Sequence, residues 1–188
     1  MQLRPDVILA GTIKSLREVV APALDPANAL AQEQLAVGIG LLELLRARLP
    51  LEFHFDLDEL ARLVAFARTL AAHGGVPGTE SCLDALRVAE RSGVDVLARA
   101  GAAPAEVVGA VIELRARSGA AVTALFERGD AELGRALARE TLDYSREQLL
   151  RDRAWTAPQG WEARAEPLPA IEALLDRSAS TSTEQREK

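Results

Sequence analysis

The segment EFHFDLDEL, residues 52–60, contains the side chains of this sequence that are best suited to chemistry. His54 is followed at close spacing by Asp56, Asp58 and Glu59, and no other segment brings a histidine and carboxylates so close together. Imidazole and carboxylate groups bind divalent metals and transfer protons in acid–base catalysis. The segment is therefore a candidate metal or acid–base site, in which His54 and Asp58 are candidate catalytic residues.

The same residues also match the pattern that begins an α-helix. If Asp56 is the N-cap, Glu59 takes the third helical position and completes a capping box. Phe55 and Leu60 then occupy the two positions of a hydrophobic staple, and Asp58 adds negative charge in the first turn, where the helix dipole favours it. Because one cause explains all these features, we interpret the segment as a helix start and not as a site.

Three further residues could take part in chemistry. Glu43 lies in the most apolar predicted helix and is a candidate residue for acid–base catalysis, provided that burial shifts the pKa of its carboxyl. His73 precedes Gly74-Gly75, where the carbonyl end of a helix stabilises a positive imidazole. Cys82 follows a helix start and is interpreted as a small core residue. Neither of the two histidines follows a glutamate by three residues, so the two Glu-x-x-His pairs of a di-iron site cannot be assembled. The sequence also has no phosphate-binding loop. We therefore expect no cofactor, and the lack of a set of ligands predicts no metal.

Composition and charge exclude several classes of function. The chain has 188 residues and a net charge of −6, and Lys14 and Lys188 are its only lysines. The arginines alternate with acidic residues, whereas DNA binding needs a clustered basic face. A nucleic-acid or anionic-membrane partner is therefore not expected. The sequence has neither a signal peptide nor a run of about 18 apolar residues, which predicts a cytoplasmic protein. The preference for arginine favours a GC-rich bacterial genome.

Apolar residues recur with a helical period along most of the chain, and alternation of period two is nearly absent. The second predicted helix, which begins at Asp25-Pro26, is apolar most of the way round and is expected to be buried at the centre. Proline and glycine mark most of the other ends. The predicted helices cover residues 5–21, 25–49, 57–73, 79–100, 104–128 and 131–152.

Long helices with short connections predict an all-α bundle of five to six main helices whose neighbours are mostly antiparallel. We assign this bundle to residues 1–152. Residues 153–177 form a loop-rich extension with a short helix, which docks on the bundle through Trp155 and Trp161. Tryptophan is also common at interface hot spots, so the two side chains could instead anchor a partner. Residues 178–188 read as a disordered tail.

The N-terminal stretch RPDVILAGTIKSLREVVAPAL and the following GLLELL resemble a family of small all-helical bacterial proteins classed as a domain of unknown function. In that family the genes often lie beside those for an aminoglycoside-phosphotransferase-like kinase and an acyl-CoA dehydrogenase. The resemblance is clearest over the first 50 residues, and its motif is apolar and carries no catalytic residue. It implies a helical fold and a protein partner encoded nearby.

These observations lead to two hypotheses of function. The first is a non-enzymatic accessory or interaction protein that binds a protein partner or a second copy of itself, since a helical bundle can present a helix face. The second is a bundle that binds an apolar small molecule such as an acyl chain, or an enzyme of unrecognised type. A closed apolar cavity that reaches a buried carboxylate or histidine would favour the second.

Overall fold

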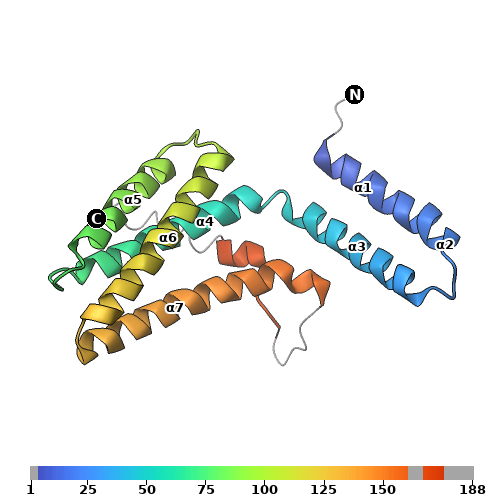
Figure 1. The fold of residues 1–188 in the computed structure, drawn as a ribbon. Coiled ribbons are helices and arrows are strands. Elements are labelled where there is room, and N and C mark those ends of the chain that lie inside the picture. The colour runs from blue at the N-terminus through green and yellow to red at the C-terminus, as the bar shows by residue number, and fades with distance from the viewer. Residues whose placement is uncertain (1–3, 161–166, 176–188) are drawn as a thin grey trace. The chain divides into compact units, whose positions relative to one another are not determined.

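The computed structural model describes residues 4–160 and 167–175, and the regular secondary structure in these ranges is helical (Figure 1). This confirms the predicted all-α class. Residues 171–175 form a short additional helix near the predicted one. The other elements are α1 (Pro5–Ser15), the π-helix η1 (Leu16–Val20), α2 (Ala21–Ala23), α3 (Ala29–Arg48), α4 (Glu52–Ala72), α5 (Glu80–Ala98), α6 (Pro104–Arg128), α7 (Ala131–Thr156) and the 3-10 helix η2 (Ala157–Gln159).

Contacts between residues divide the chain into two compact units. Unit 1 consists of Met1–Glu52 and Arg153–Pro169, and unit 2 consists of Phe53–Asp152 and Ala170–Lys188. From the sequence we instead assign residues 1–152 to one bundle. Within unit 1, Arg48 binds the carbonyl oxygens of Ala154 and Trp155 near the end of α7. Trp161 and the predicted tail, residues 178–188, lie outside the described residues.

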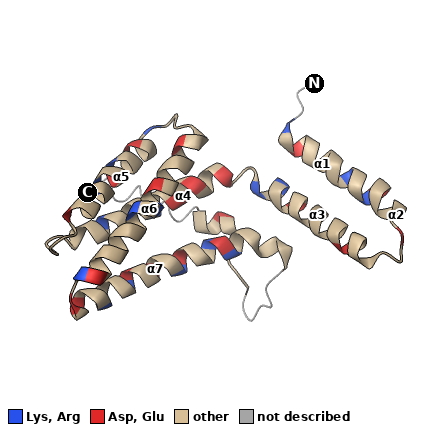
Figure 2. Ribbon diagram, in the orientation of Figure 1, with Lys and Arg blue, Asp and Glu red and all other residues tan. Residues whose placement is uncertain are grey.

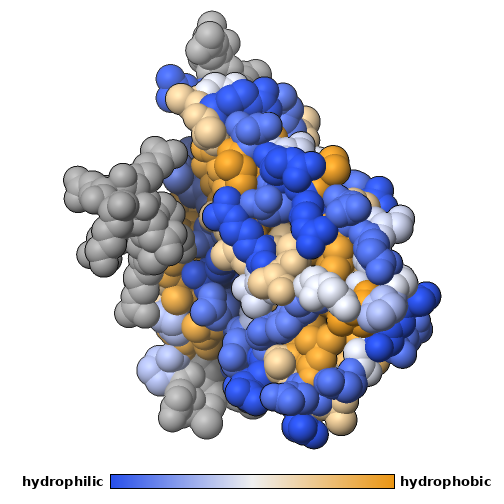
Figure 3. Space-filling view, turned by 90° about the vertical axis from the view of Figure 1, so that its left-hand side faces the viewer, coloured by the Kyte–Doolittle hydropathy of each residue, from blue (hydrophilic) through white to orange (hydrophobic). Residues whose placement is uncertain are grey.

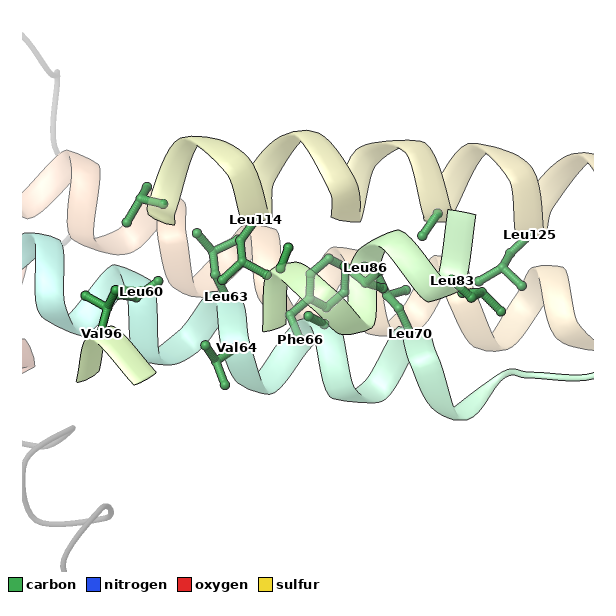
Figure 4. Packing of buried hydrophobic residues seen from close by; sticks show 14 of the residues in the cluster. Leu60, Leu63, Val64, Phe66, Leu70, Leu83, Leu86, Val96, Leu114 and Leu125 are labelled. Carbon is green, nitrogen blue, oxygen red and sulfur yellow. The ribbon is translucent and has the colours of Figure 1, made fainter. Parts of the chain in front are cut away.

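The core of unit 2 is built around α4. Leu60, Leu63, Ala67 and Leu70 follow one another at helical spacing and are at most 1% exposed. They pack against buried residues of α5 and α6, and Figure 4 shows leucines of all three helices pointing toward one another. Leu137 of α7 completes this core. The buried polar residues of α4, Asp58 and Glu59, lie directly before Leu60, the first leucine of this core.

Gly93 marks the closest approach inside this core. A Cβ atom at Gly93 would lie 2.9 Å from Leu114 Cδ1 and 3.0 Å from Val64 Cγ2. Helix α5 continues through Gly93 without interruption. The missing side chain therefore lets α5 pack directly against α4 and α6.

We expect Gly93→Val to lower the free energy of unfolding by about 1–3 kcal/mol, because the added methyl groups overpack the core. Gly119 of α6 is the control, since a Cβ there would meet nothing within 4 Å. The same change at Gly119 should alter stability by less than about 0.5 kcal/mol. Urea unfolding measures both variants, and equal losses would contradict the close packing at Gly93.

Unit 1 has a smaller core. Helices α1 and α3 run in opposite directions, and ion pairs join Asp6 to Arg46 at 2.6 Å and Arg17 to Glu43 at 2.7 Å (Figure 1). The buried hydrophobic residues among those described in this unit are Ile13, Ile39 and Ala154. A pair of helices with so few buried side chains gains little from the hydrophobic effect.

Helix α3 begins later than predicted, at Ala29, after the N-cap Asn28, whose side-chain oxygen accepts a hydrogen bond from the backbone N–H of Ala31 at 3.1 Å. The prediction that this helix is a buried, central one is wrong. Ile39 is its buried hydrophobic residue, and Leu30, Val37, Leu41 and Leu45 are exposed. The apolar pattern alone could not say how many neighbours the helix has.

The end of α7 extends beyond its predicted limit and is held by Arg48. The Arg48 side chain is buried and donates hydrogen bonds to the carbonyl oxygens of Ala154 at 3.2 Å and Trp155 at 2.9 Å. Its guanidinium carbon also lies 5.5 Å from the centre of the Trp155 ring, within the range of a cation–π contact. Trp155 therefore docks internally, as the sequence analysis favoured, but from a helix and not from a loop.

Candidate functional site

The segment EFHFDLDEL lies inside α4 and does not begin it. Helix α4 starts at Glu52, directly after a turn in which the backbone N–H of Leu51 donates to the carbonyl of Arg48 at 2.8 Å. Asp56 is therefore in the second turn, and the predicted N-cap, capping box and staple are wrong. The helix start was predicted one turn too late in the sequence. The turn at residues 49–51 leads directly into the helix, so Asp56 and Glu59 are not needed as capping residues.

Asp58 is buried and binds two arginines. Its Oδ2 atom accepts a hydrogen bond from Arg62 Nε at 2.8 Å and forms an ion pair with Arg151 Nε, also at 2.8 Å. Arg62 lies one turn further along α4, whereas Arg151 lies near the end of α7. A buried carboxylate needs such partners, because removing its charge from water costs several kcal/mol. Asp58 thus joins α4 to α7.

Glu59, the next residue, forms an ion pair with Arg115 of α6. Its side chain is almost completely buried, and this burial raises the pKa of the Glu59 carboxyl above its ordinary value. The positive charges of Arg115 and Arg62 offset part of that rise. Two adjacent acids of α4 therefore point to different helices, α7 and α6.

The polar cluster continues along α7. Arg62 Nη1 donates a hydrogen bond to Gln148 Oε1 at 2.7 Å, and Gln148 in turn donates to Asp152 at 2.8 Å. Tyr144 stacks on Phe66 with ring centres 4.6 Å apart, and burial raises the pKa of its hydroxyl. These acids are engaged by arginines and amides within the cluster. The arrangement stabilises the packing of three helices and offers no activated nucleophile.

The other predicted candidates do not join this cluster. His54 is exposed and contacts the neighbouring Phe53 ring edge-on, although it lies one turn before Asp58. Glu43 is in unit 1, where it is exposed and paired with Arg17. Among the described residues, no group of three or more His, Cys, Asp and Glu side chains could hold a metal ion. Within unit 2, the exposed His54 does not join the cluster around the buried Asp58.

His73 and Cys82 have structural contacts. Helix α4 ends at Ala72, so His73 lies just beyond the last turn in which it was predicted. Its Nε2 atom is 2.9 Å from Glu140 Oε2 of α7. The Cys82 thiol donates to the carbonyl of Thr79 at 3.0 Å and is half-buried beside the core. Both side chains help to fix the same end of unit 2.

Each unit also has an open groove. The groove of unit 1 has a volume of about 510 Å³ and lies between α3 and the segment Pro158–Gln159. The groove of unit 2 has a volume of about 330 Å³ and lies between α4 and α7. Lys, Arg, Asp and Glu residues are intermingled along the helices, as Figure 2 shows. Neither groove is an enclosed cavity.

Sequence reasoning missed the partners of the two buried acids. Arg62 follows Asp58 by four residues, which is the spacing of an ion pair on one helix face and could have been noticed. Arg115 and Arg151 are far away in the sequence and are brought together only by the packing of α6 and α7. No local pattern in the sequence indicates those two contacts.

Comparisons with protein-family models, with curated proteins and with solved structures found no match for this chain. Within residues 4–160 and 167–175, no helix combines the length and apolar character needed to cross a membrane.

Replacing Asp58 tests its structural role against the role of a metal ligand. Asp58→Ala should lower the free energy of unfolding by about 3–5 kcal/mol, because it leaves two arginines without their shared carboxylate. His54→Ala, at an exposed position of the same helix, should change stability by less than about 0.5 kcal/mol. Added zinc or manganese should leave the melting temperature of the wild type unchanged. A metal-induced rise that both substitutions abolish would contradict this account, since a ligand bound only to the native state stabilises it.

Glu59 should make stability depend on pH. Its pKa is raised above the ordinary value of 4.5, so the folded protein binds this proton more tightly than the unfolded chain does. The contribution of Glu59 is then fully present below 4.5 and is lost as the pH rises through the raised folded-state pKa. Glu59→Gln cannot ionise, and we expect it to gain stability relative to the wild type as the pH rises above 4.5. Urea unfolding at a series of pH values above 4.5 measures the difference, and a difference that shrinks as the pH rises would contradict the assignment.

Proposed function

We propose that this protein is a non-enzymatic accessory protein that binds a protein partner through the open face of α3. The observation that carries the proposal is a row of exposed large hydrophobic residues on this helix. Leu30, Val37, Leu41 and Leu45 are 68%, 45%, 44% and 50% exposed. At about 100° per residue, these four side chains project from less than a quarter of the helix circumference.

The remaining surface of α3 is used within unit 1. Asp6 and Arg17 of the first helical stretch bind Arg46 and Glu43 on one side of α3. On another side, Gln159 Nε2 donates a hydrogen bond to the carbonyl of Gly40 at 2.8 Å. None of these contacts involves a residue of the exposed row. An apolar row of this length is typical of a helix that packs against another protein.

The groove beside the row extends the surface available to a partner. Val37 belongs to both, and Leu44, Ala47 and Pro158 continue the apolar lining. An amphipathic helix of a partner can lie along α3 and place a side chain in this groove, which is a common mode of helix recognition. Glu43 and Arg17 at the groove would then select the orientation of the partner by charge.

The partner that we propose is a phosphotransferase-like enzyme of the kind that the family resemblance implies. An interaction function agrees with the absence of reactive groups among the described residues, where the buried acids are neutralised by arginines. The alternative function, a small-molecule-binding bundle or an enzyme, has less support. Leucines fill the centre of unit 2, and the grooves of both units are open to solvent.

Exposed hydrophobic residues also occur outside α3, so a test needs a matched control. Figure 3 shows hydrophobic patches among hydrophilic residues on one face of the molecule. Leu142 of α7 is suitable, because it is 54% exposed and lies outside unit 1.

Leu41→Glu should weaken binding to the co-expressed phosphotransferase-like neighbour at least about tenfold, because it buries a charge in an apolar contact. Leu142→Glu should leave binding unchanged. Co-purification and light scattering measure the association, and circular dichroism confirms that both variants fold. A wild-type protein that stays monomeric beside this neighbour would overturn the proposal. Equal losses of binding in the two variants would also overturn it. If the wild type instead forms a homodimer that Leu41→Glu disrupts, the partner is a second copy of this chain and not the enzyme.

A further inference from the structure

The groove between α4 and α7 in unit 2 is a second surface with a different character. Residues at helical spacing on both helices line it along two turns. They are Arg62, Ala65, Phe66 and Thr69 of α4 and Glu140, Asp143, Tyr144 and Glu147 of α7. Seven residues of helix span about 10 Å, so the groove can hold about two turns of a partner segment.

The α7 side of this groove is a row of carboxylates. Glu140, Asp143 and Glu147 are separated by three and four residues, and the side chains of Asp143 and Glu147 are 68% and 65% exposed. Their ion pairs with basic residues of α7 are long, at 3.6 Å to Arg146 and 3.9 Å to Arg151. Glu140 is paired with His73 at 2.9 Å, so the negative charge that remains available to a ligand is mainly that of Asp143 and Glu147.

The opposite side and the floor supply apolar contact and a hydrogen-bond donor. Phe66 and Tyr144 stack in parallel, and Ala65 leaves room above them. The Arg62 side chain is 11% exposed, and its Nη2 atom is buried without a hydrogen-bond partner, whereas Nε and Nη1 are bonded. A buried donor without a partner is costly and is relieved by any acceptor that reaches it. A peptide carbonyl or amide oxygen is such an acceptor.

We propose that this groove binds a basic peptide segment of a partner protein, with lysine or arginine side chains that face the carboxylate row. The carboxylates are spread along two turns and do not converge on one point, which suits a series of cations and not a single metal ion. The floor of the groove, formed by the stacked rings of Phe66 and Tyr144, can contact the aliphatic part of the lysine or arginine side chains. This surface lies in unit 2, whereas the α3 face lies in unit 1.

The test uses a fluorescent amphipathic helical peptide with lysines on one face, and an analogue in which glutamines replace the lysines. We expect the lysine peptide to bind the wild type with an affinity that falls with salt, and the analogue not to bind. Neutralising two acids in D143N/E147Q should weaken binding about fivefold or more. The control D84N/E113Q removes the same charge from exposed, ion-paired acids of α5 and α6, and should have little effect.

A second pair of variants tests the place of binding. Ala65→Arg fills the groove with a positive side chain and should abolish binding, whereas Ala105→Arg on the exposed side of α6 should not. Thermal unfolding confirms that each variant folds. Equal losses in the groove and control variants would mean a general attraction of a cationic peptide to an acidic protein and would overturn the proposal, as would no binding to the wild type.

Discussion

The burial of two adjacent acids, Asp58 and Glu59, is the constraint on which the rest of unit 2 depends. Each carboxylate is costly to remove from water unless a cation accompanies it. The two side chains leave α4 in different directions, so one arginine must come from α7 and another from α6. These two pairs tie α6 and α7 to adjacent positions of α4. Leu60, the next residue along α4, belongs to the leucine core of unit 2.

This constraint also decides where function can lie. The only segment that combines a histidine with closely spaced acids uses its buried acids to hold helices together, and His54 faces solvent. Arginines bind both buried carboxylates, and this use of Asp58 and Glu59 is structural. The two units differ in the surfaces that they expose. Unit 1 presents an apolar helix, and unit 2 presents an acidic groove.

The sequence predicted the helices much better than their environment. Apolar period, together with prolines and glycines such as Pro104 and Gly74, located six helices because these signals are local. The acidic segment was misplaced by one turn, since a capping box and the second turn of a helix rich in acids look alike in sequence. The burial of Asp58 depends on Arg151, which is distant in the chain, and no local signal contains that information. Apolar residues lie around most of the circumference of α3 and predicted that the helix is buried by its neighbours. The described chain covers only part of its surface.

The coupling energy between Asp58 and Arg151 tests the central claim most directly, because it isolates the contact between α4 and α7 from the other effects of each substitution. Urea unfolding of the wild type, Asp58→Asn, Arg151→Gln and the double variant gives this energy as a double-mutant cycle. If the pair holds the two helices together, the coupling should be about 2 kcal/mol or more in favour of the native pair. A coupling near zero, with each substitution adding independently, would show that the buried acid does not organise unit 2.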